Sequence, residues 1–456
     1  MLTHISVDGF RSLSNFEMEI RPGLNILIGP NGSGKSNIIS YFQFLSRLAR
    51  TGLSDAVSLT GGAGAFFQKT GETKYTNRVT AVTRGLTFVE EIDKSDRAGW
   101  MLYEYRFGIH ASERFDSIIF SEQEIRLSSI GGVRSDVPAM DALQHEYFDW
   151  DLVIESSTTP AHARVVKLSD GWLAREASKA ISRKDILDQF DRDISEASFE
   201  SISLIRLRSR FFNPILYIAG DFLGGETLSI DPAEVKRPED SAREPGIRSD
   251  GSGLAATLWH MLNEPTYKAY DYPYYSRPRN FQYWRGRGWA KVYKQLQSLI
   301  QLVNSQIQNV YVTNEPFDNQ LKIKVRMEGP RGDVDLPLSA MSDGTIKWAS
   351  LITAILTHRS IFAIEEPENF LHPLMLTEIV KLMRESTSEK FSFVIMTTHS
   401  ETLLNAASPY DVIVVSMEHG ITRGRRPANP DQLLREIQET GFGLGHYYLA
   451  GDLSDA

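Results

Sequence analysis

The spacing of hydrophobic and polar residues changes twice within the first 50 positions of this chain. Residues 4–7 and 16–20 alternate apolar and polar side chains, which predicts two half-buried strands. The apolar run 24–28 predicts a third strand, and the apolar residues of 36–50 recur at helical spacing along one face. The chain is therefore expected to begin with strands that lead into an amphipathic helix.

Short strand-like runs follow, and after them comes a long polar stretch. The runs, which predict an antiparallel β layer, are residues 79–82, 86–89, 102–107, 118–120 and 125–127. Residues 136–212 are polar and weakly periodic, and within them 179–201 is typical of a solvent-facing helix. Residues 231–250 are rich in Pro, Glu, Asp and Arg, which predicts an exposed loop.

Helical and strand periods alternate from residue 254 onward. Two helices, 254–262 and 291–303, precede a hairpin-like pair of strands, 310–313 and 321–327. The later predicted elements are helix 345–357, strand 361–364, helix 371–386, strand 392–396, helix 400–406 and strand 411–415. This alternation predicts an α/β fold, and the lack of sustained heptads argues against a long coiled-coil arm.

Composition narrows the class of protein. With 456 residues the chain is long enough for two to three domains of about 150 residues each. The net charge of −9 argues against a globally basic nucleic-acid-binding protein, although it allows local basic patches. Cysteine is absent, which excludes disulfides and thiol nucleophiles. Residues 1–20 lack an apolar core and no segment is suited to cross a bilayer, so we expect no signal peptide, no membrane contact and a cytoplasmic location.

The first candidate site is a glycine-rich loop between strand 24–28 and helix 36–50. Its residues are Gly29, Pro30, Asn31, Gly32, Ser33, Gly34, Lys35, Ser36 and Asn37. The glycines let the backbone curl so that its N–H groups face a polyphosphate, while Lys35 reaches the β- and γ-phosphates and Ser36 ligates Mg²⁺. The pattern predicts binding of ATP or a close relative, with an ordinary glycine-rich turn as the alternative.

Two carboxylates end a later apolar strand. Residues 361–364 are followed directly by Glu365 and Glu366. A carboxylate at the carboxyl end of such a strand is placed to bind Mg²⁺, and the next one is placed to orient the attacking water. We therefore assign Glu365 to the metal and Glu366 to the water. The alternative is an acidic turn whose glutamates only favour the start of the following helix.

A histidine follows the next apolar strand, in the polar cluster 397–400. There His399 is placed to donate a hydrogen bond to a γ-phosphate. The alternative is that the histidine is incidental, and Ser400 is expected to cap the following helix in either case.

Small residues also open the helix at 345–357, with Ser342 and Gly344 just before it. Such a helix start is an anion-binding nest. One nucleotide does not easily use two helix starts of the same copy, so we expect this segment to meet ATP held by a second copy. The alternative is an ordinary helix N-cap.

The order of these motifs resembles a known superfamily. FRS at 10–12, GPNGSGKSN, SDGT, IEEPENFLHP and TTHS occur in the order typical of ABC-class ATPases of the SMC and RecF branch. The chain is most similar to the bacterial "AAA family ATPase" group that includes the ATPase half of the overcoming-lysogenization-defect nucleases. The resemblance covers about 1–110 and 245–456.

The resemblance implies an ABC-type P-loop ATPase head. Such a head has a mixed sheet with an antiparallel β layer, split here by a helical or irregular insertion. We expect its N-terminal half at residues 1–130, a partner-specific insertion at 131–250, and its C-terminal half at 251–456.

The resemblance also implies roles for single residues. Lys35 and Ser36 correspond to the phosphate and Mg²⁺ groups of the family, and Arg11 corresponds to an arginine that approaches the nucleotide. Ser342 and Gly344 correspond to the signature that closes over ATP bound by a second subunit.

The motifs of the second half are matched in the same way. Glu365, Glu366 and His399 correspond to the Walker B residue, the catalytic glutamate and the switch histidine. Glu365 replaces the aspartate of most ABC proteins. The glutamine of the Q-loop is not assigned, and Gln68 and Gln123 are its candidates.

The predicted function is that of an ATPase, with ATP and Mg²⁺ as cofactors, that assembles as a homo-oligomer of at least two heads. We expect it to control a separate effector, a nuclease among the candidates, in bacterial anti-phage defence. Only about 55 residues follow His399, too few for the TOPRIM nuclease domain of the resembled family.

Two other functions stay open. A DNA-binding, RecF- or SMC-like ATPase in repair or maintenance is suggested by a basic and aromatic stretch that contains Arg277, Arg279, Arg285 and Arg287. A solvated loop is the alternative for that stretch. The other function is a non-hydrolysing, ATP-bound scaffold, against which Glu366 and His399 count.

Overall fold

The computed structural model of this chain describes residues 1–72, 74–90, 98–114, 117–129, 151–158, 161–168, 188, 192, 200–206, 215–223, 225–263, 289–315, 317–357, 360–390, 392–451 and 453. The chain divides into two compact units, each made of several stretches of sequence. The first unit is Met1–Arg21, Pro30–Leu223 and Val415–Arg425, and the second is Pro22–Gly29, Gly224–Val414 and Arg426–Ala456. The predicted boundaries at 130 and 250 stay predictions.

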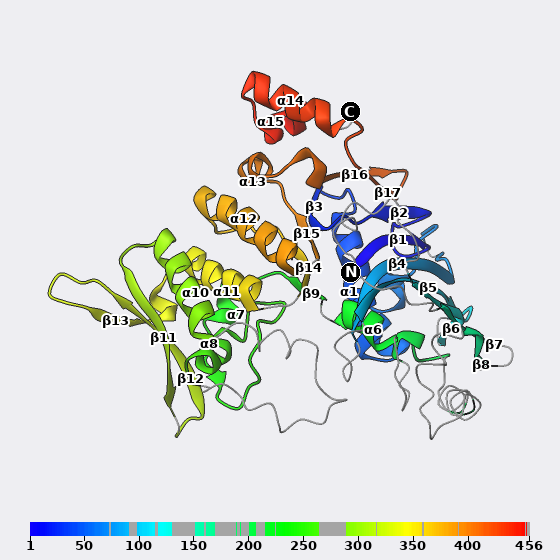
Figure 1. The fold of residues 1–456 in the computed structure, drawn as a ribbon, viewed down its shortest axis with the longest axis horizontal. Helices are drawn as coiled ribbons and strands as arrows, with labels where there is room; N and C mark the ends of the chain where they lie inside the picture. Colours follow the sequence, from blue (N-terminus) through cyan, green and yellow to red (C-terminus); the bar gives the residue numbers. More distant parts are fainter. Residues whose placement is uncertain are drawn as a thin grey trace. The chain divides into compact units, whose positions relative to one another are not determined.

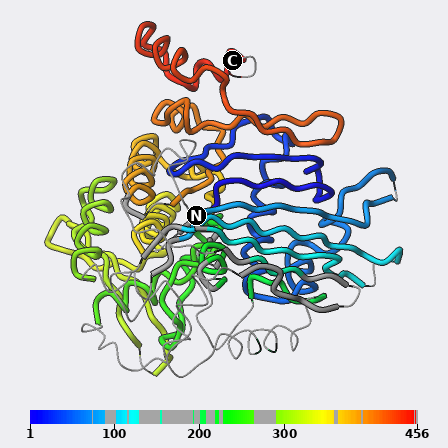
Figure 2. The backbone as a smooth tube through the Cα atoms, turned by 45° about the vertical axis from the view of Figure 1, so that its right-hand side comes forward, coloured from blue at the N-terminus to red at the C-terminus, as the bar shows by residue number. Residues whose placement is uncertain are grey.

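A seven-stranded antiparallel sheet dominates the first unit (Figure 1). Its strands are β1 (Leu2–Asp8), β2 (Phe16–Glu19), β4 (Arg78–Glu90), β5 (Ala98–Ala111), β6 (Ile118–Ser129), β7 (Asp151–Thr158) and β8 (Ala161–Leu168). They lie in the order β2-β1-β4-β5-β6-β7-β8, and Figure 2 shows the blue to cyan strands side by side. Strands β7 and β8 fall in the range for which a helical or irregular insertion was expected.

The antiparallel β layer was predicted, but its division into five short strands was wrong. Runs 79–82 and 86–89 form the single strand β4, and runs 118–120 and 125–127 form β6. Polar residues between the apolar runs were taken as strand ends. They belong to the strands, because one face of an antiparallel sheet can face water.

Helices of the first unit pack an aromatic core. They are α1 (Lys35–Arg50), α2 (Leu53–Leu59), α3 (Ala63–Phe66), α6 (Ile215–Leu223) and the short 3₁₀ turn η1 (Leu204–Arg206). The ring of Phe10 lies 5.5 Å from Tyr41 of α1 and 5.1 Å from Phe66 of α3, both edge-on. This packing fixes the segment after β1 against α1, the helix that follows the glycine-rich loop.

Parallel strands form the central sheet of the second unit. They are β9 (Gly225–Leu228), β14 (Ser360–Glu365), β15 (Phe393–Thr397), β3 (Gly23–Ile28) and β16 (Val412–Glu418), side by side in that order. Each neighbouring pair is parallel. In the first unit the chain continues from β16 into β17 (Ile421–Arg425). Strands buried on both faces read as continuous apolar runs, which is why β3, β14 and β15 were predictable.

The second unit also holds a smaller antiparallel sheet and most of the helices. The sheet consists of β10 (Glu239–Asp240), β11 (Ile307–Glu315), β12 (Gln320–Met327) and β13 (Val334–Pro337). The helices are α7 (Pro232–Val235), α8 (Leu254–Asn263), α10 (Trp289–Val303), α11 (Asp343–Thr357), α12 (Pro373–Lys390), α13 (Glu401–Ala406), α14 (Pro430–Thr440) and α15 (Leu444–Ala450), with 3₁₀ turns η2 (Leu338–Ala340) and η3 (Pro409–Asp411). The predicted pairing of 310–313 with 321–327 is confirmed by the β11–β12 register.

Helix α11 forms the core of the second unit, since every residue from Ile346 to Thr357 is buried. Trp348 is fully buried, and its indole N–H donates a hydrogen bond of 2.9 Å to the carbonyl of Leu299 in α10. The donor of this large side chain is thereby satisfied, as burial of a tryptophan requires.

The prediction of an exposed loop at 231–250 was partly right, because most of these residues are irregular and at least partly exposed, but the segment is also packed at several points. The segment contains α7 and β10, and Val235 and Ile247 are only 3% and 2% exposed. Glu239 is buried, and its carboxylate accepts the N–H groups of Gly253 at 2.5 Å and Ala256 at 3.0 Å. A charged residue was read as exposed, but here it satisfies the N–H groups at the start of α8.

Among the described residues, none of the helices combines the length and the apolar character needed to span a bilayer.

Candidate functional site

The glycine-rich loop links β3 to α1 through left-handed backbone. Gly29, Gly32 and Gly34 have φ angles of 154°, 79° and 101°. Such angles strain any residue with a Cβ atom, so the chain can take this path only because glycine stands at these positions. The loop continues directly into Lys35, the first residue of α1.

Donors within the loop suit an anion. Lys35 is 7% exposed, and its ammonium donates to the carbonyl of Pro30 at 3.1 Å, so the side chain folds back over the loop. The hydroxyl of Ser33 is buried and has no hydrogen-bond partner among the described residues. A buried donor without an acceptor costs free energy unless a ligand supplies one. The loop therefore fits a polyphosphate.

Arg11 lies beside the first turns of α1. Its guanidinium donates to the Ser40 hydroxyl at 2.9 Å, to the Asn37 side-chain oxygen at 3.5 Å and to the Thr60 carbonyl at 2.8 Å. Burial lowers the pKa of Arg11, and the nearby charge of Arg47 lowers it further. The structure thus brings together Arg11 and Asn37, two of the residues predicted to bind the nucleotide.

The two predicted catalytic carboxylates lie where β14 ends. Glu365 is paired in register with Thr397 at the end of β15. Burial raises the pKa of Glu365, and the charge of Glu366 raises it further. Burial and the charge of Glu366 make the ionised form of Glu365 less stable. A bound cation would stabilise that ionised form, so Glu365 fits a Mg²⁺ ligand.

Glu366 is held in an unusual backbone conformation. Its φ is 41°, in the left-handed region that side chains avoid. Its N–H donates to the carbonyl and the hydroxyl of Thr397 at 3.1 and 3.2 Å, and its carboxylate accepts from the Asn369 side chain at 3.0 Å. Strain of this kind persists only where surrounding contacts fix it, and it is common at functional sites.

His399 is exposed and lies next to the same loop. Its backbone N–H donates to the carboxylate of Glu368 at 2.6 Å, and Ser400 caps α13 by accepting the N–H of Leu403. The prediction that Ser400 caps the helix is confirmed. The sequence did not predict that Glu368 would hold His399, although its position two residues after Glu366 places it near the predicted site.

The predicted signature segment packs against the loop that follows Glu366. Ser342 accepts the N–H of Thr345 at 3.2 Å, as a helix N-cap does. A Cβ atom on Gly344 would lie 2.4 Å from the carbonyl oxygen of Phe370, so only glycine fits there. Asp343 forms an ion pair of 2.7 Å with Lys236. Within the second unit, the signature segment therefore packs against Phe370 in the loop that follows Glu366.

Strand order within the second unit relates Gly29, where the glycine-rich loop begins, to these carboxylates. Thr397 of β15 is in register with Leu27 of β3 on one side and with Glu365 of β14 on the other. Because all three strands are parallel, the loop after Ile28 leaves from the same sheet edge as Glu365. Tyr448 of α15 hydrogen-bonds to the backbone of Gly29.

Other sequence candidates have different outcomes. Gln123 is 2% exposed, accepts from the Tyr105 hydroxyl at 2.7 Å and donates to the Ile202 carbonyl at 3.0 Å. It has a structural role in β6, so Gln68 is the better Q-loop candidate. The predicted DNA-contacting arginines, which lie outside the described residues, are Arg277, Arg279, Arg285 and Arg287.

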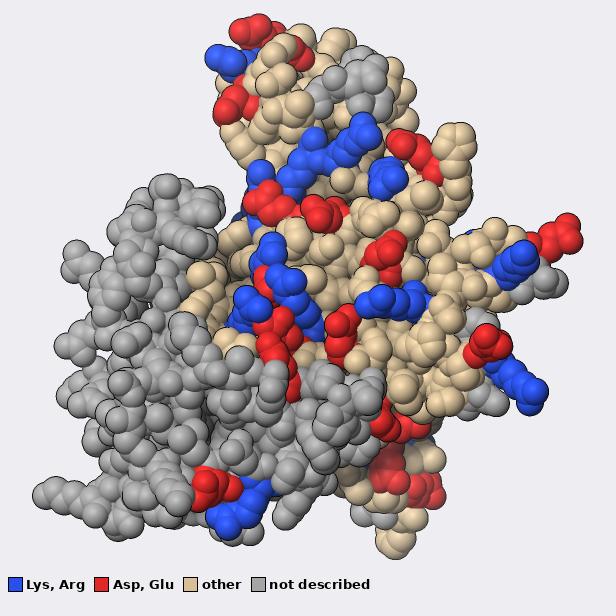
Figure 3. Space-filling view, turned by 90° about the vertical axis from the view of Figure 1, so that its right-hand side faces the viewer, with Lys and Arg blue, Asp and Glu red and all other residues tan. Residues whose placement is uncertain are grey.

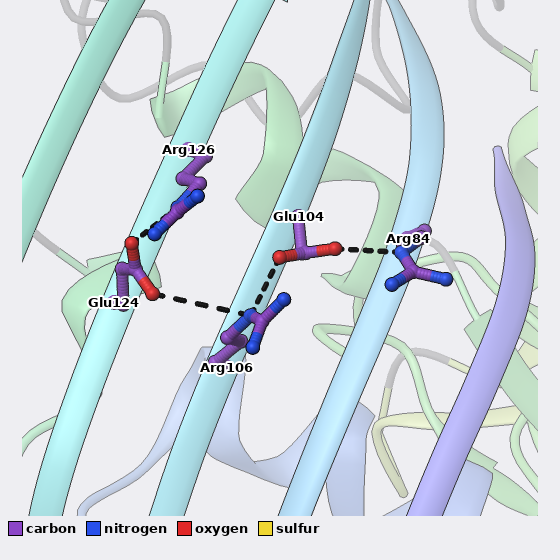
Figure 4. Close-up of polar contacts among 5 residues, drawn as sticks. All are labelled: Arg84, Glu104, Arg106, Glu124 and Arg126. Atoms are coloured by element: carbon purple, nitrogen blue, oxygen red, sulfur yellow. Dashed lines mark hydrogen bonds and ion pairs between the residues drawn. The ribbon is translucent and has the colours of Figure 1, made fainter.

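Basic residues on the exposed face of the seven-stranded sheet are paired with acids. Glu104 accepts from both Arg84 and Arg106 at 2.6 Å, and Glu124 pairs with Arg126 (Figure 4). The face drawn in Figure 3 likewise intersperses described basic and acidic side chains. Nucleic-acid phosphates bind best to a surface of unpaired basic residues. The arginines on this face of the sheet alternate with glutamates and are paired with them, so the face does not fit nucleic acid.

Comparison with known proteins places the chain in a family. Residues 24–405 match the family described as "AAA domain, putative AbiEii toxin, Type IV TA system". The DNA replication and repair protein RecF of Nocardioides sp. is 40% identical over 63 residues, which is 14% of this chain and 15% of that protein. RecF of Lactobacillus acidophilus is 28% identical over 242 residues, 50% of this chain and 59% of that protein.

The chain thus matches little more than half of the length of the Lactobacillus acidophilus RecF, and a smaller share of the Nocardioides RecF. A solved structure, "Crystal structure of the SmcHead bound to the C-winged helix domain of ScpA", is 13% identical, with a TM-score of 0.46 over 93% of this chain and 97% of that one.

Proposed function

This chain belongs to that AAA-domain family, and we propose that it is an ABC-type ATPase of the SMC and RecF kind that binds ATP with Mg²⁺ and hydrolyses it at Glu366. The observation that carries the proposal is the fixed, left-handed backbone of Glu366 at the end of β14. The parallel register that starts the glycine-rich loop from the same sheet edge supports it.

Each residue has a role set by its chemistry. Lys35 and the backbone of residues 29–34 bind the polyphosphate, while Ser36 and Glu365 hold the metal. Mg²⁺, when bound, neutralises charge on the phosphates. Glu366 orients water at the γ-phosphate, and His399 donates a hydrogen bond on the same side.

The signature segment acts on a second copy of the chain. Ser342 caps α11 and Gly344 keeps its first turn close to Phe370, so the start of a 15-residue helix is available for an anion. We propose that two heads enclose ATP between the glycine-rich loop of one copy and the Ser342–Gly344 segment of the other. The assembly is then a homo-oligomer that forms with ATP and separates after hydrolysis.

The assembled heads control a separate effector protein in bacterial anti-phage defence. The family description, which names a toxin of a toxin–antitoxin system, agrees with such a role. A RecF-like role in DNA repair is the second candidate, and the RecF relatives favour it. A non-hydrolysing scaffold is the third, and an intact Glu366 with its supporting contacts argues against it.

The test compares the parent protein with Lys35→Ala and Glu366→Gln. We expect Lys35→Ala to lose ATP binding, and Glu366→Gln to bind ATP, lose turnover and accumulate as an ATP-bound oligomer of higher mass. Glu385→Gln, the same change at an exposed position of α12, is the control and should behave like the parent.

Double-stranded DNA is the second variable of this experiment. Turnover that rises with DNA in the parent favours the repair function, whereas slow turnover indifferent to DNA, in a stable assembly, favours control of an effector. Turnover of Glu366→Gln at the parent's rate would refute the role of Glu366. An ATP-binding parent without turnover would favour the scaffold.

A further inference from the structure

A lysine lies buried inside α11, one turn after the signature segment. Lys347 is 4% exposed, and its neighbours on the helix are buried as well. Among the described residues its ammonium makes one hydrogen bond, 3.2 Å to the backbone carbonyl of Glu366. An ammonium has three donors, and burial of a charge with few partners is unfavourable. Fold stability alone therefore gives no reason for a lysine here.

Two carboxylates of the Glu366 loop act electrostatically on this ammonium. Burial lowers the pKa of Lys347, and the charges of Glu368 and Glu366 partly oppose that effect. One oxygen of Glu368 holds the backbone N–H of His399 at 2.6 Å, and its other oxygen is buried without a hydrogen-bond partner among the described residues. Lys347 is thus next to both the water-orienting glutamate and the residue that holds the His399 loop.

The backbone of Glu366 is fixed at both of its ends. The N–H is bound by Thr397 of β15, and the carbonyl is bound by Lys347 of α11. A φ of 41° is strained and persists only where contacts hold it; besides Lys347, the N–H of Asn369 also donates to the Glu366 carbonyl, at 3.2 Å. Helix α11 touches the same loop a second time, where Gly344 meets the Phe370 carbonyl. The loop that carries Glu366 is therefore attached to the signature helix at two points.

We propose that Lys347 is a positioning residue, which fixes the backbone of Glu366 and so couples the signature helix to the orientation of the attacking water. This inference rests on the proposed role of Glu366 in hydrolysis. A purely structural lysine would predict a loss of stability on its removal. A positioning lysine predicts a loss of hydrolysis with stability unchanged or increased.

The test is Lys347→Met, which keeps the length of the side chain and removes its charge and its donors. Lys381→Met on α12, where the lysine is 64% exposed in an ion pair with Glu378, is the matched control. We expect single-turnover hydrolysis by Lys347→Met to fall about 10-fold or more, as the loss of a charged hydrogen bond implies. Affinity for ATP and the urea midpoint should not fall.

A double variant shows whether Lys347 acts through Glu366. Lys347→Met should add no further loss of hydrolysis in a Glu366→Gln background. Hydrolysis by Lys347→Met at the parent's rate would overturn the proposal. Losses of ATP affinity and of the urea midpoint in parallel with hydrolysis would also overturn it, since they indicate a structural role.

Hydrogen exchange without nucleotide separates this inference from the proposed function. The N–H of Glu366 donates to the Thr397 carbonyl of β15, and the N–H of Asn369 donates to the Glu366 carbonyl within the loop. Their exchange should accelerate about 10-fold in Lys347→Met and stay unchanged in Lys381→Met. If exchange is faster in Lys347→Met and the parent shows no ATPase turnover, the proposed hydrolysis is refuted, but Lys347 is still the residue that holds the loop. Unchanged exchange refutes the role of Lys347 itself.

Discussion

Replacement of Gly34 by alanine should damage the glycine-rich loop for two separable reasons. The φ of Gly34 is 101°, where a side chain costs about 1–2 kcal/mol. In addition, a Cβ atom would lie 1.9 Å from the Thr422 hydroxyl oxygen and 2.8 Å from its methyl group. Thr422 is fully buried and its hydroxyl is hydrogen-bonded to Ser12 at 2.6 Å, so it has little room to move.

Gly32→Ala provides the matched control. Gly32 also has a positive φ, 79°, but nothing lies within 4 Å of its Cβ position. This variant should cost only the backbone term of about 1–2 kcal/mol. Overpacking adds about 1–3 kcal/mol for Gly34→Ala, which gives a total of about 2–5 kcal/mol. Because 1 kcal/mol shifts Tm by about 2–4 °C in units of 150–250 residues, the two variants should be distinguishable by thermal unfolding.

The source of the clash is tested by the double variant Gly34→Ala, Thr422→Ala. Removing the threonine hydroxyl and methyl groups leaves room for the new Cβ, so the two changes together should cost about 1 kcal/mol less than their sum. Urea unfolding of the parent, both single variants and the double variant measures this coupling. Equal losses in Gly32→Ala and Gly34→Ala, or strict additivity in the double variant, would refute the steric argument.

Three further predictions concern other parts of the fold. Although burial alone would raise the pKa of Glu104, hydrogen bonds from Arg106 and Arg84 lower it below its ordinary value. Its stabilisation, about 1 kcal/mol at most for such exposed pairs, is present above about pH 4.5 and lost as pH falls through the folded pKa. The stability difference between parent and Glu104→Gln should therefore vanish in acid, and a difference constant with pH would contradict this. Trp348→Phe removes the indole N–H that donates to the Leu299 carbonyl in the core, so we expect a loss of about 1–3 kcal/mol in urea unfolding, with a neutral result speaking against the hydrogen bond. Glu239→Gln keeps only one acceptor for the two N–H groups at the start of α8, and a loss of about 1–3 kcal/mol is expected, which an unchanged urea midpoint would disprove.

Sequence alone predicted β3, β14, β15 and β16 of the central sheet, but not β9, and it predicted the loop that follows β3. Runs such as 24–28, where Asn25 is the one polar residue, and 361–364 are almost entirely apolar because both faces of a parallel strand are buried, and such runs need no tertiary information to be recognised. The loop was recognisable because its glycines, Lys35 and Ser36 have a fixed spacing required by phosphate chemistry. Family membership, predicted from the order of the motifs, is confirmed by the family match over residues 24–405.

Tertiary structure decided what the local pattern left ambiguous. The length of β4 and β6 was hidden because polar residues on an exposed strand face resemble loop residues. Glu239 was read as solvated, since only the folded chain shows that its carboxylate meets the amides of Gly253 and Ala256.

The same limit applies to the residues around Glu366. Its carboxylate was identified from the sequence, but the 41° φ and the partners that hold it come from elements far away in the chain. Lys347 lies 19 residues before Glu366, and Thr397 lies 31 residues after it. Sequence fixes which chemical groups exist and how neighbours in the chain are spaced. Which distant donor meets which acceptor is decided only when helices and strands pack, because burial is what makes an unpaired polar group costly.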